Sequence, residues 1–254
     1  MKSIAENRPN FRAYSSDLEL NSTSVSLSAV ETNHLINVMR ARQGNLVALF
    51  NGRGLEALGE IATLRKSCQI LIHNTWETYR DKPEIVLAQA LPKGKTMDSV
   101  VRKCCELGVS RIIPLKTENS EFQLTGRREQ SKIEKWRSVA IEGCKQSCNS
   151  FVPKIETPIS LDEFISFDVQ GNLYVGAIHP IARPISSFAF DFKNLNKGSE
   201  MIYIIVGPEG DFSKLEYESL DKIGASFYSL GPLVLKVVTA VTVSVFSFKS
   251  FLSE

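Results

Sequence analysis

The chain has 254 residues, of which 43% are hydrophobic and 23% are charged, and its formal net charge is +2. This is the composition of a globular protein with a packed core, and the length suits one large domain or two ordinary ones. The small net charge excludes a strongly basic chain, so any surface that binds nucleic acid has to be local.

Neither a membrane segment nor a metal site is expected. No window approaches the roughly 18 consecutive apolar residues that a membrane-spanning helix needs, and the amino-terminal residues lack the apolar core of a signal peptide. The sequence therefore favours a cytoplasmic protein with no membrane partner. The five cysteines form no CxxC pair and have no histidine nearby, so we expect buried thiols and no metal.

The amino-terminal region is predicted to be a small β-rich unit. Ser28 and Glu31 have the spacing of a capping box, which opens a short helix. Asn45–Phe50 is predicted to be a strand, Asn51–Gly54 a tight turn, and Leu55–Thr75 two or three short strands with charged interruptions.

Strands and helices alternate in the rest of the chain. The charged stretch Asp81–Pro83 is typical of a linker, so we place one domain at residues 1–78 and a second at 79–254. Helical spacing of apolar residues covers Met97–Leu107 and Ile133–Cys144. The strands predicted in the second domain are Glu84–Leu91, Arg111–Leu115, Leu173–Ile178, Met201–Val206 and Ser226–Leu230. This alternation predicts an α/β fold with a parallel sheet that helices cover on both faces.

Two of these strands end in turns that contain glycine and proline. Met201–Val206 runs into Gly207-Pro208-Glu209-Gly210, and Ser226–Leu230 runs into Gly231-Pro232. A helix between them is opened by Ser213, which stands at capping-box distance from a glutamate. Because ligands bind at the carboxyl edge of open parallel sheets, the two turns together predict a ligand site.

Common catalytic motifs do not name the ligand. The chain has no GxxxxGK[ST] loop for phosphates and no GxSxG elbow for a serine nucleophile. Gly52-Arg53-Gly54 leads into further strands, whereas a dinucleotide fingerprint has to open a helix. The residues by themselves therefore indicate a site without a stated ligand.

Several segments resemble one known family over nearly the whole chain and in the family's order. IIVGPEGDFSKLE and YSLGPLVLKVVTA are similar to the two signature stretches of the RsmE family. Those proteins are SPOUT-class methyltransferases that modify N3 of a uridine in small-subunit ribosomal RNA. Further similar segments are HLINVMRARQGNLVALFNGRG, LAQALPKGKTMDSVVRKCCELGVSRIIPLKTENS and KWRSVAIEGCKQSCNSFVPKI.

The resemblance implies an architecture and partners. It implies a PUA-like β-barrel at residues 1–78 that helps to hold RNA. It also implies a SPOUT-type parallel sheet with a carboxy-terminal trefoil knot at 79–254, and such knots are rare exceptions to ordinary topology. The implied cofactor is S-adenosylmethionine (SAM), bound by the knot loops and completed across a homodimer. The implied substrate is small-subunit ribosomal RNA or the assembled small subunit.

The resemblance also assigns roles to residues. Glu209 and Lys236 would act in catalysis, although a turn carboxylate that is bonded to nearby amides is an equally good interpretation of Glu209. Arg40, Arg42 and Arg53 would contact RNA phosphates. The residues assigned to the cofactor are Gly207, Pro208, Gly210, Leu230, Gly231, Leu233 and Leu235.

The chain departs from the family pattern at charged positions. Lys236 and Val238 stand where the family usually has arginine and glutamate, and an arginine expected after Lys145-Gln146-Ser147 is missing. We interpret the first two as a compensated exchange of a former ion pair, because removing both partners costs less than stranding one. Two hypotheses remain: an active uridine-N3 methyltransferase, or a non-catalytic or re-targeted RNA-binding relative.

Overall fold

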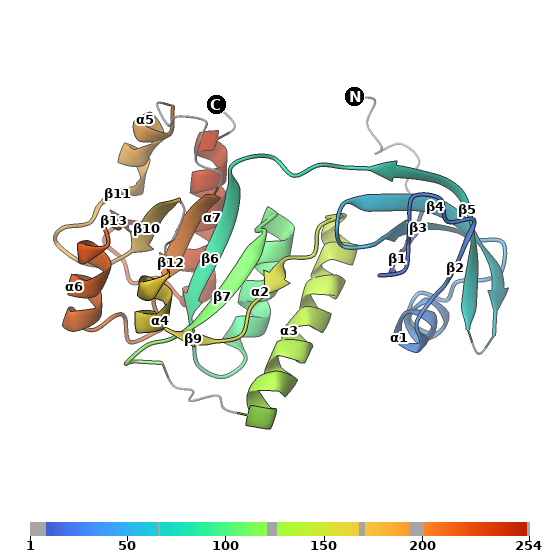
Figure 1. The fold of residues 1–254 in the computed structure, drawn as a ribbon, viewed down its shortest axis with the longest axis horizontal. Helices are drawn as coiled ribbons and strands as arrows, with labels where there is room; N and C mark the ends of the chain where they lie inside the picture. Colours follow the sequence, from blue (N-terminus) through green and yellow to red (C-terminus); the bar gives the residue numbers. More distant parts are fainter. Residues whose placement is uncertain (1–8, 66, 121–125, 168–170, 194–200, 253–254) are drawn as a thin grey trace. The chain divides into compact units, whose positions relative to one another are not determined.

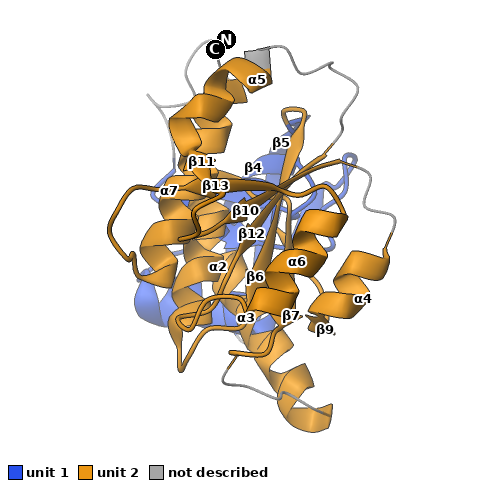
Figure 2. Cartoon of the chain, turned by 90° about the vertical axis from the view of Figure 1, so that its left-hand side faces the viewer, with its two compact units in different colours: residues 1–80, 144–152 blue, residues 81–143, 153–254 orange. Residues whose placement is uncertain are grey.

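The computed structural model describes residues 9–65, 67–120, 126–167, 171–193 and 201–252. The chain divides into two compact units (Figures 1 and 2). Unit 1 comprises Met1–Arg80 and Cys144–Val152, and unit 2 comprises Asp81–Gly143 and Pro153–Glu254.

Unit 1 is built on a five-stranded sheet with the order β1-β3-β4-β5-β2. Only the β1–β3 pair is parallel among the described pairs. Leu35, Leu49 and Ile61 are fully buried in the core of this unit. The strands are β1 Phe11–Tyr14, β2 Ser24–Ser26, β3 Leu46–Phe50, β4 Leu55–Leu64 and β5 Cys68–Glu77.

Of the two or three short strands predicted over Leu55–Thr75, the structure has two, and they are long: β4 and β5 have ten residues each and form one hairpin. The predicted charged interruptions do not break β4, since Glu56 lies within the strand and is 7% exposed. Its carboxylate pairs with Arg12 at 2.7 Å and accepts a hydrogen bond from Trp76 Nε1 at 2.9 Å. These partners satisfy the buried charge and allow the strand to continue.

The capping box predicted at Ser28 is only half formed. Ser28 Oγ accepts the hydrogen bond from the Glu31 amide and opens α1 (Ala29–Asn33), which continues as a π-helix over His34–Val38. The Glu31 carboxylate turns inward instead of reaching back to the cap. It pairs with Lys145 at 2.9 Å and accepts from the Tyr14 amide, and both side chains of the pair are almost fully buried.

Unit 2 contains the predicted parallel sheet, with the order β11-β13-β10-β12-β6-β7-β8 and with β9 paired to β7. All its described pairings are parallel. The strands are β6 Glu84–Ala90, β7 Arg111–Lys116, β8 Lys154–Ile155, β9 Ile159–Ser160, β10 Asn172–Gly176, β11 Arg183–Pro184, β12 Met201–Val206 and β13 Ser226–Ser229.

Helices cover both faces of this sheet, as predicted. Helices α4 and α6 lie on one face, and α2 and α7 lie on the other (Figure 2). Ile205 of β12 shares a buried cluster with Phe164 of α4 and Leu220 of α6. The helices of unit 2 are α2 Thr96–Leu107, α3 Gly126–Ser147 (which ends in unit 1), α4 Leu161–Ser166, α5 Phe188–Lys193, α6 Lys214–Lys222 and α7 Val237–Leu252.

The start of α6 follows the predicted local chemistry. Ser213 Oγ accepts from the Glu216 amide, and the Glu216 carboxylate accepts from the Ser213 amide, so both bonds of the capping box are present. Tyr217 and Leu220 form the buried face of this helix, whereas Leu215 is 71% exposed. The helix therefore begins where the sequence indicates.

The cysteines are free thiols, and four of the five are buried. Burial raises the pKa of Cys68 to about 11, so this thiol stays protonated at neutral pH. In the described part of the chain no helix is long and apolar enough to cross a membrane, and no three potential metal ligands gather.

Candidate active site

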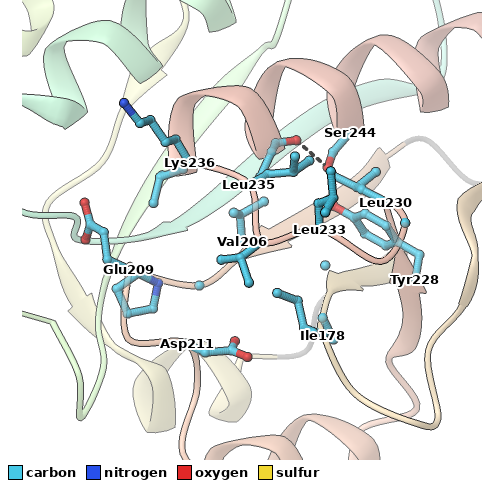
Figure 3. Close-up of a pocket in the computed structure, with 18 of the residues that line it drawn as sticks. Ile178, Val206, Glu209, Asp211, Tyr228, Leu230, Leu233, Leu235, Lys236 and Ser244 are labelled. Atoms are coloured by element: carbon cyan, nitrogen blue, oxygen red, sulfur yellow. Dashed lines mark hydrogen bonds between the residues drawn. The ribbon is translucent and has the colours of Figure 1, made fainter.

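A cavity of about 510 Å³ lies at the carboxyl ends of three adjacent parallel strands, β12, β10 and β13. The loops that follow these strands and the first turns of α7 line it (Figure 3). Its lining residues are Gly176, Ala177, Ile178, Val206, Gly207, Pro208, Glu209, Gly210, Asp211, Tyr228, Leu230, Gly231, Leu233, Val234, Leu235, Lys236, Val237, Ala240 and Ser244.

All nine residues that the sequence assigned to the cofactor or to catalysis line this one cavity. The two predicted turns do not end neighbouring strands, because β10 lies between β12 and β13. The loop after β10 is thus a third wall, which the sequence reading placed inside a strand ending at Ile178. The signal for it was present, since Gly176 is followed at short distance by Pro180, the same punctuation as in the other two turns.

Hydrogen bonds from the end of β6 and the loop after it hold the first turn, which follows β12. Gln89, which is fully buried at the end of β6, donates from Nε2 to the carbonyls of Val206 and Gly207 at 3.3 Å. The Glu209 carboxylate accepts hydrogen bonds from the Lys93 amide at 3.1 and 3.3 Å. Glu209 is therefore anchored to a neighbouring backbone, as the second interpretation of this residue anticipated.

Asn119 ties a further loop to the same turn. Its side-chain amide donates to the carbonyl oxygens of Gly210 at 3.1 Å and Asp211 at 3.0 Å. A Cβ at Gly210 would stand 3.1 Å from Asn119 Cβ, so the glycine allows this close approach. Sequence reasoning missed Asn119, because its contacts join residues 91 and 92 positions apart.

The second turn requires glycine for its backbone. Gly231 has a φ of +116°, where L side chains are strained, and its amide donates to Ser229 Oγ at 3.2 Å. A Cβ at this position would meet no atom within 4 Å. The turn therefore depends on a backbone conformation and not on close packing.

Hydrogen bonds connect the loop after β10, which forms the third wall, to β13, and connect β13 to α7. The Ala177 amide donates to the Tyr228 carbonyl at 2.9 Å. The Tyr228 hydroxyl donates to Ser244 Oγ at 2.7 Å, which donates in turn to the carbonyl of Ala240 at 2.7 Å (Figure 3). Complete burial raises the pKa of Tyr228 above its usual range, so the phenol stays neutral. This chain of bonds fixes the rear of the cavity.

The charged side chains lie at one side of the cavity and the aliphatic ones opposite. Leu230, Leu233 and Leu235 form an apolar wall, and Asp211 directs its carboxylate into the space (Figure 3). Lys236 is exposed, and its ammonium group points away from the cavity. The arrangement suits a small ligand that has an apolar ring, polar edges and a positive charge.

The three predicted RNA contacts lie in unit 1. Arg40 and Arg42 are exposed in the loop between the π-helix and β3. Arg53 is exposed in the turn after β3, where its guanidinium donates to the Ser16 carbonyl at 3.3 Å. The structure thus places Arg40 and Arg42 in the loop before β3 and Arg53 in the turn at its other end.

Comparison with known proteins identifies the class of protein that carries this fold and cavity. Residues 80–248 match the family model described as an RNA methyltransferase domain, and residues 30–72 match the RNA methyltransferase PUA domain. Since the first match spans more than half of the chain, the chain belongs to the RNA methyltransferase family.

Individual relatives narrow this class. The chain is 29% identical over 220 residues to ribosomal RNA small subunit methyltransferase E of Bacillus subtilis, covering 85% of each protein. It is 33% identical over 179 residues to the Aquifex aeolicus protein of the same name, covering 69% of this chain and 71% of that one. The resemblance to the RsmE family is therefore confirmed.

A solved structure is similar along almost its entire length. A Legionella pneumophila methyltransferase, determined in complex with its bound cofactor SAM, has a TM-score of 0.83 and 28% identity. The match covers 94% of this chain and 97% of that chain. The parallel sheet and the amino-terminal unit thus follow the architecture of a SAM-binding relative.

Proposed function

We propose that this protein is a SAM-dependent methyltransferase that methylates N3 of a uridine in small-subunit ribosomal RNA. The observation that carries the proposal is the cavity at the ends of β10, β12 and β13, in a chain that belongs to the RNA methyltransferase family. The names of the relatives supply the substrate, and the bound cofactor of the Legionella structure supplies the methyl donor.

The residues of the cavity fit this cofactor. Gly207 and Gly231 keep backbone amides and carbonyls accessible, which the recognition of an adenine edge requires. A side chain at Gly207 would stand 3.2 Å from Asp211 Oδ1 and 3.3 Å from the Phe212 ring, so the turn has no room for one. We assign Pro208, Gly210, Leu230, Leu233 and Leu235 to the same ligand.

When bound, SAM supplies a methyl group that is activated by its attachment to a sulfonium. The protein has to align uridine N3 with this methyl group and to accommodate the proton that N3 loses. We assign the orienting role to Glu209, because its carboxylate is already held by the Lys93 amide. Lys236 extends outward from the cavity, where it can stabilise negative charge on an arriving RNA.

Further features belong to the proposal through the family. These are the closure of the unit 1 sheet into a barrel, the trefoil knot in the segment leading into α7, a homodimer and a cytoplasmic location. Exposed apolar side chains beside the cavity support the dimer: Leu233 is 74% exposed and Val234 is 81% exposed. Light scattering coupled to size-exclusion chromatography tests this, and a monomer at micromolar concentration would contradict it.

We propose that residues 1–78 serve RNA binding and that 79–254 serve catalysis. In the structure the helix end and loop Cys144–Val152 also belong to unit 1. Lys145, which precedes the position of the missing arginine, lies in this segment and neutralises the buried Glu31.

Removal of two arginines should weaken RNA binding through charge alone. The double variant Arg40→Ala/Arg42→Ala is expected to lower the affinity for RNA and to reduce the slope of log K against log salt by about 1.4 to 1.8, because each phosphate contact contributes about 0.7 to 0.9. Filter binding at several salt concentrations measures both. A parallel shift with an unchanged slope would contradict a phosphate role for this loop.

Loss of the Asn119 amide should loosen the first turn. Asn119→Ala removes two neutral hydrogen bonds, each contributing about 0.5 to 1.5 kcal/mol, so we expect SAM affinity to fall by about tenfold. Asn119→Asp keeps the shape but cannot donate, and should weaken binding at least as much. Wild-type affinity in both variants would show that the two bonds do not shape the cofactor site.

Calorimetric titration with SAM tests the enzyme hypothesis against its alternative. Binding with a stoichiometry of one per chain is expected. If the folded protein takes up no SAM, the non-catalytic RNA-binding hypothesis replaces the proposal.

A further inference from the structure

Asp211 combines an unusual backbone with a side chain aimed at the cavity. Its φ of +60° lies in the left-handed region, which aspartate and asparagine adopt more readily than other residues apart from glycine. It lines the cavity, and its carboxylate points into the space (Figure 3). The sequence alone assigned no role to Asp211, and its place in the lining of the cavity calls for one.

Two donors hold the Asp211 carboxylate in place. Oδ1 accepts from the Phe212 amide at 2.8 Å and from the Tyr217 hydroxyl at 2.7 Å. Burial, and then the bond to Asp211, raise the pKa of Tyr217 well above its usual range, so the phenol keeps the proton that it donates. Both bonds use Oδ1, so they fix the side-chain rotamer and leave Oδ2 at the edge of the cavity, without a partner among the residues that the structure describes (Figure 3).

The other charges near the cavity do not cancel this one. Glu209 is also negative and is held by the Lys93 amide. The Lys236 ammonium points outward (Figure 3). His179 stacks on the Tyr217 ring with the ring centroids 5.3 Å apart and does not line the cavity. The electrostatic potential within the cavity is therefore dominated by the carboxylates of Glu209 and Asp211.

We propose that Asp211 makes this cavity selective for the cationic methyl donor over its neutral sulfide product. The inference rests on the proposed function. SAM carries a sulfonium charge, whereas S-adenosylhomocysteine has lost it and otherwise keeps the same groups. A fixed carboxylate attracts the first through this extra charge and has no such charge to attract in the second.

The expected charge selectivity does not depend on how the ligand lies in the cavity. The cavity is about 510 Å³. A space of that size keeps any group within it about 10 Å or less from a wall residue, which is no more than one Debye length at moderate salt. By contrast, a hydrogen bond that a ribose hydroxyl donated to Asp211 would contribute equally to both ligands. Charge selectivity also lowers inhibition by the product.

The test compares two ligands with three proteins. SAM and S-adenosylhomocysteine are titrated calorimetrically into the wild type, Asp211→Asn and Asp221→Asn. Asparagine tolerates the left-handed backbone, so the first variant removes the charge and keeps the turn. Asp221 is an exposed residue of the same helix region that does not line the cavity, so the second is a matched loss of charge.

For Asp211→Asn we expect SAM to bind about tenfold more weakly and S-adenosylhomocysteine to change less than about twofold, whereas Asp221→Asn leaves both unchanged. Equal weakening of both ligands, or no change in either, would overturn the inference. Asp211→Gly, which suits a φ of +60°, replaces the asparagine variant if that one fails to fold. A wild-type protein that binds neither ligand would refute the proposed function itself, which is a different result.

Discussion

Gly231→Val should abolish SAM binding while the protein stays folded. A β-branched residue cannot adopt a φ of +116° without strain of about 1 to 3 kcal/mol, so the turn has to rearrange. That movement displaces the backbone and Leu230 and Leu233, which line the cavity. We expect an affinity loss of at least about 100-fold by calorimetry, because several contacts are lost together.

The fold should survive because the site of the change is open. A Cβ at Gly231 meets no atom within 4 Å, so no core contact is disturbed. Gly224 offers a matched control: its φ is +78°, its Cβ would also meet nothing within 4 Å, and it does not line the cavity. Gly224→Val should incur similar strain and bind SAM normally. Wild-type SAM affinity in Gly231→Val would remove this turn from the cofactor site.

The largest loss of stability is expected at the buried ion pair of unit 1. Lys145→Met keeps the length of the side chain but leaves Glu31, which is 4% exposed, without its cation. Removing one partner of a buried pair costs about 3 to 5 kcal/mol. The chain has two tryptophans, so urea unfolding followed by Trp76 fluorescence in a Trp136→Phe background reports on unit 1.

A second substitution separates charge from packing. In the double variant Lys145→Met/Glu31→Gln no buried charge is stranded, so most of the lost free energy of unfolding should return. If the double variant is as unstable as the sum of the two single variants, the pair contributes through packing and the electrostatic account of Lys145 is wrong.

Local chemistry made part of the fold predictable. The strand Met201–Val206 has the predicted bounds because its apolar run is bounded by a glycine–proline turn. Gly108 ends α2 in the left-handed conformation, and Ser213 and Glu216 cap α6. In each case the signal lies within four residues of the feature that it sets.

Features that depend on distant partners were not predictable. The long strand β4 contains the buried Glu56, whose carboxylate is neutralised by Arg12 and accepts a hydrogen bond from Trp76. The Glu31 carboxylate does not complete the capping box, because it pairs with Lys145, which is 114 positions away in the sequence. The position of β10 between the two glycine-proline turns follows from the order of strands in the sheet, which no local pattern encodes.

The residues of the site also divide into those that the local sequence predicts and those that it does not. The nine assigned residues line one cavity, because turn residues and apolar walls are encoded in the segments themselves. Two further residues were not predicted. Asn119 bonds to residues 91 and 92 positions away in the sequence, and the left-handed backbone of Asp211 has no local sequence signal. Of the two departures from the family pattern, Lys236 is exposed at the edge of the cavity and Val238 lies in the first turn of α7 outside the cavity lining.

The central claim is methyl transfer from SAM to N3 of a uridine in small-subunit ribosomal RNA. The most direct measurement incubates the purified protein with methyl-labelled SAM and with either free RNA or small subunits, and then maps labelled nucleosides by mass spectrometry. We predict label in a single N3-methyluridine. Binding of SAM without label in the RNA, or label on another atom, would contradict the account.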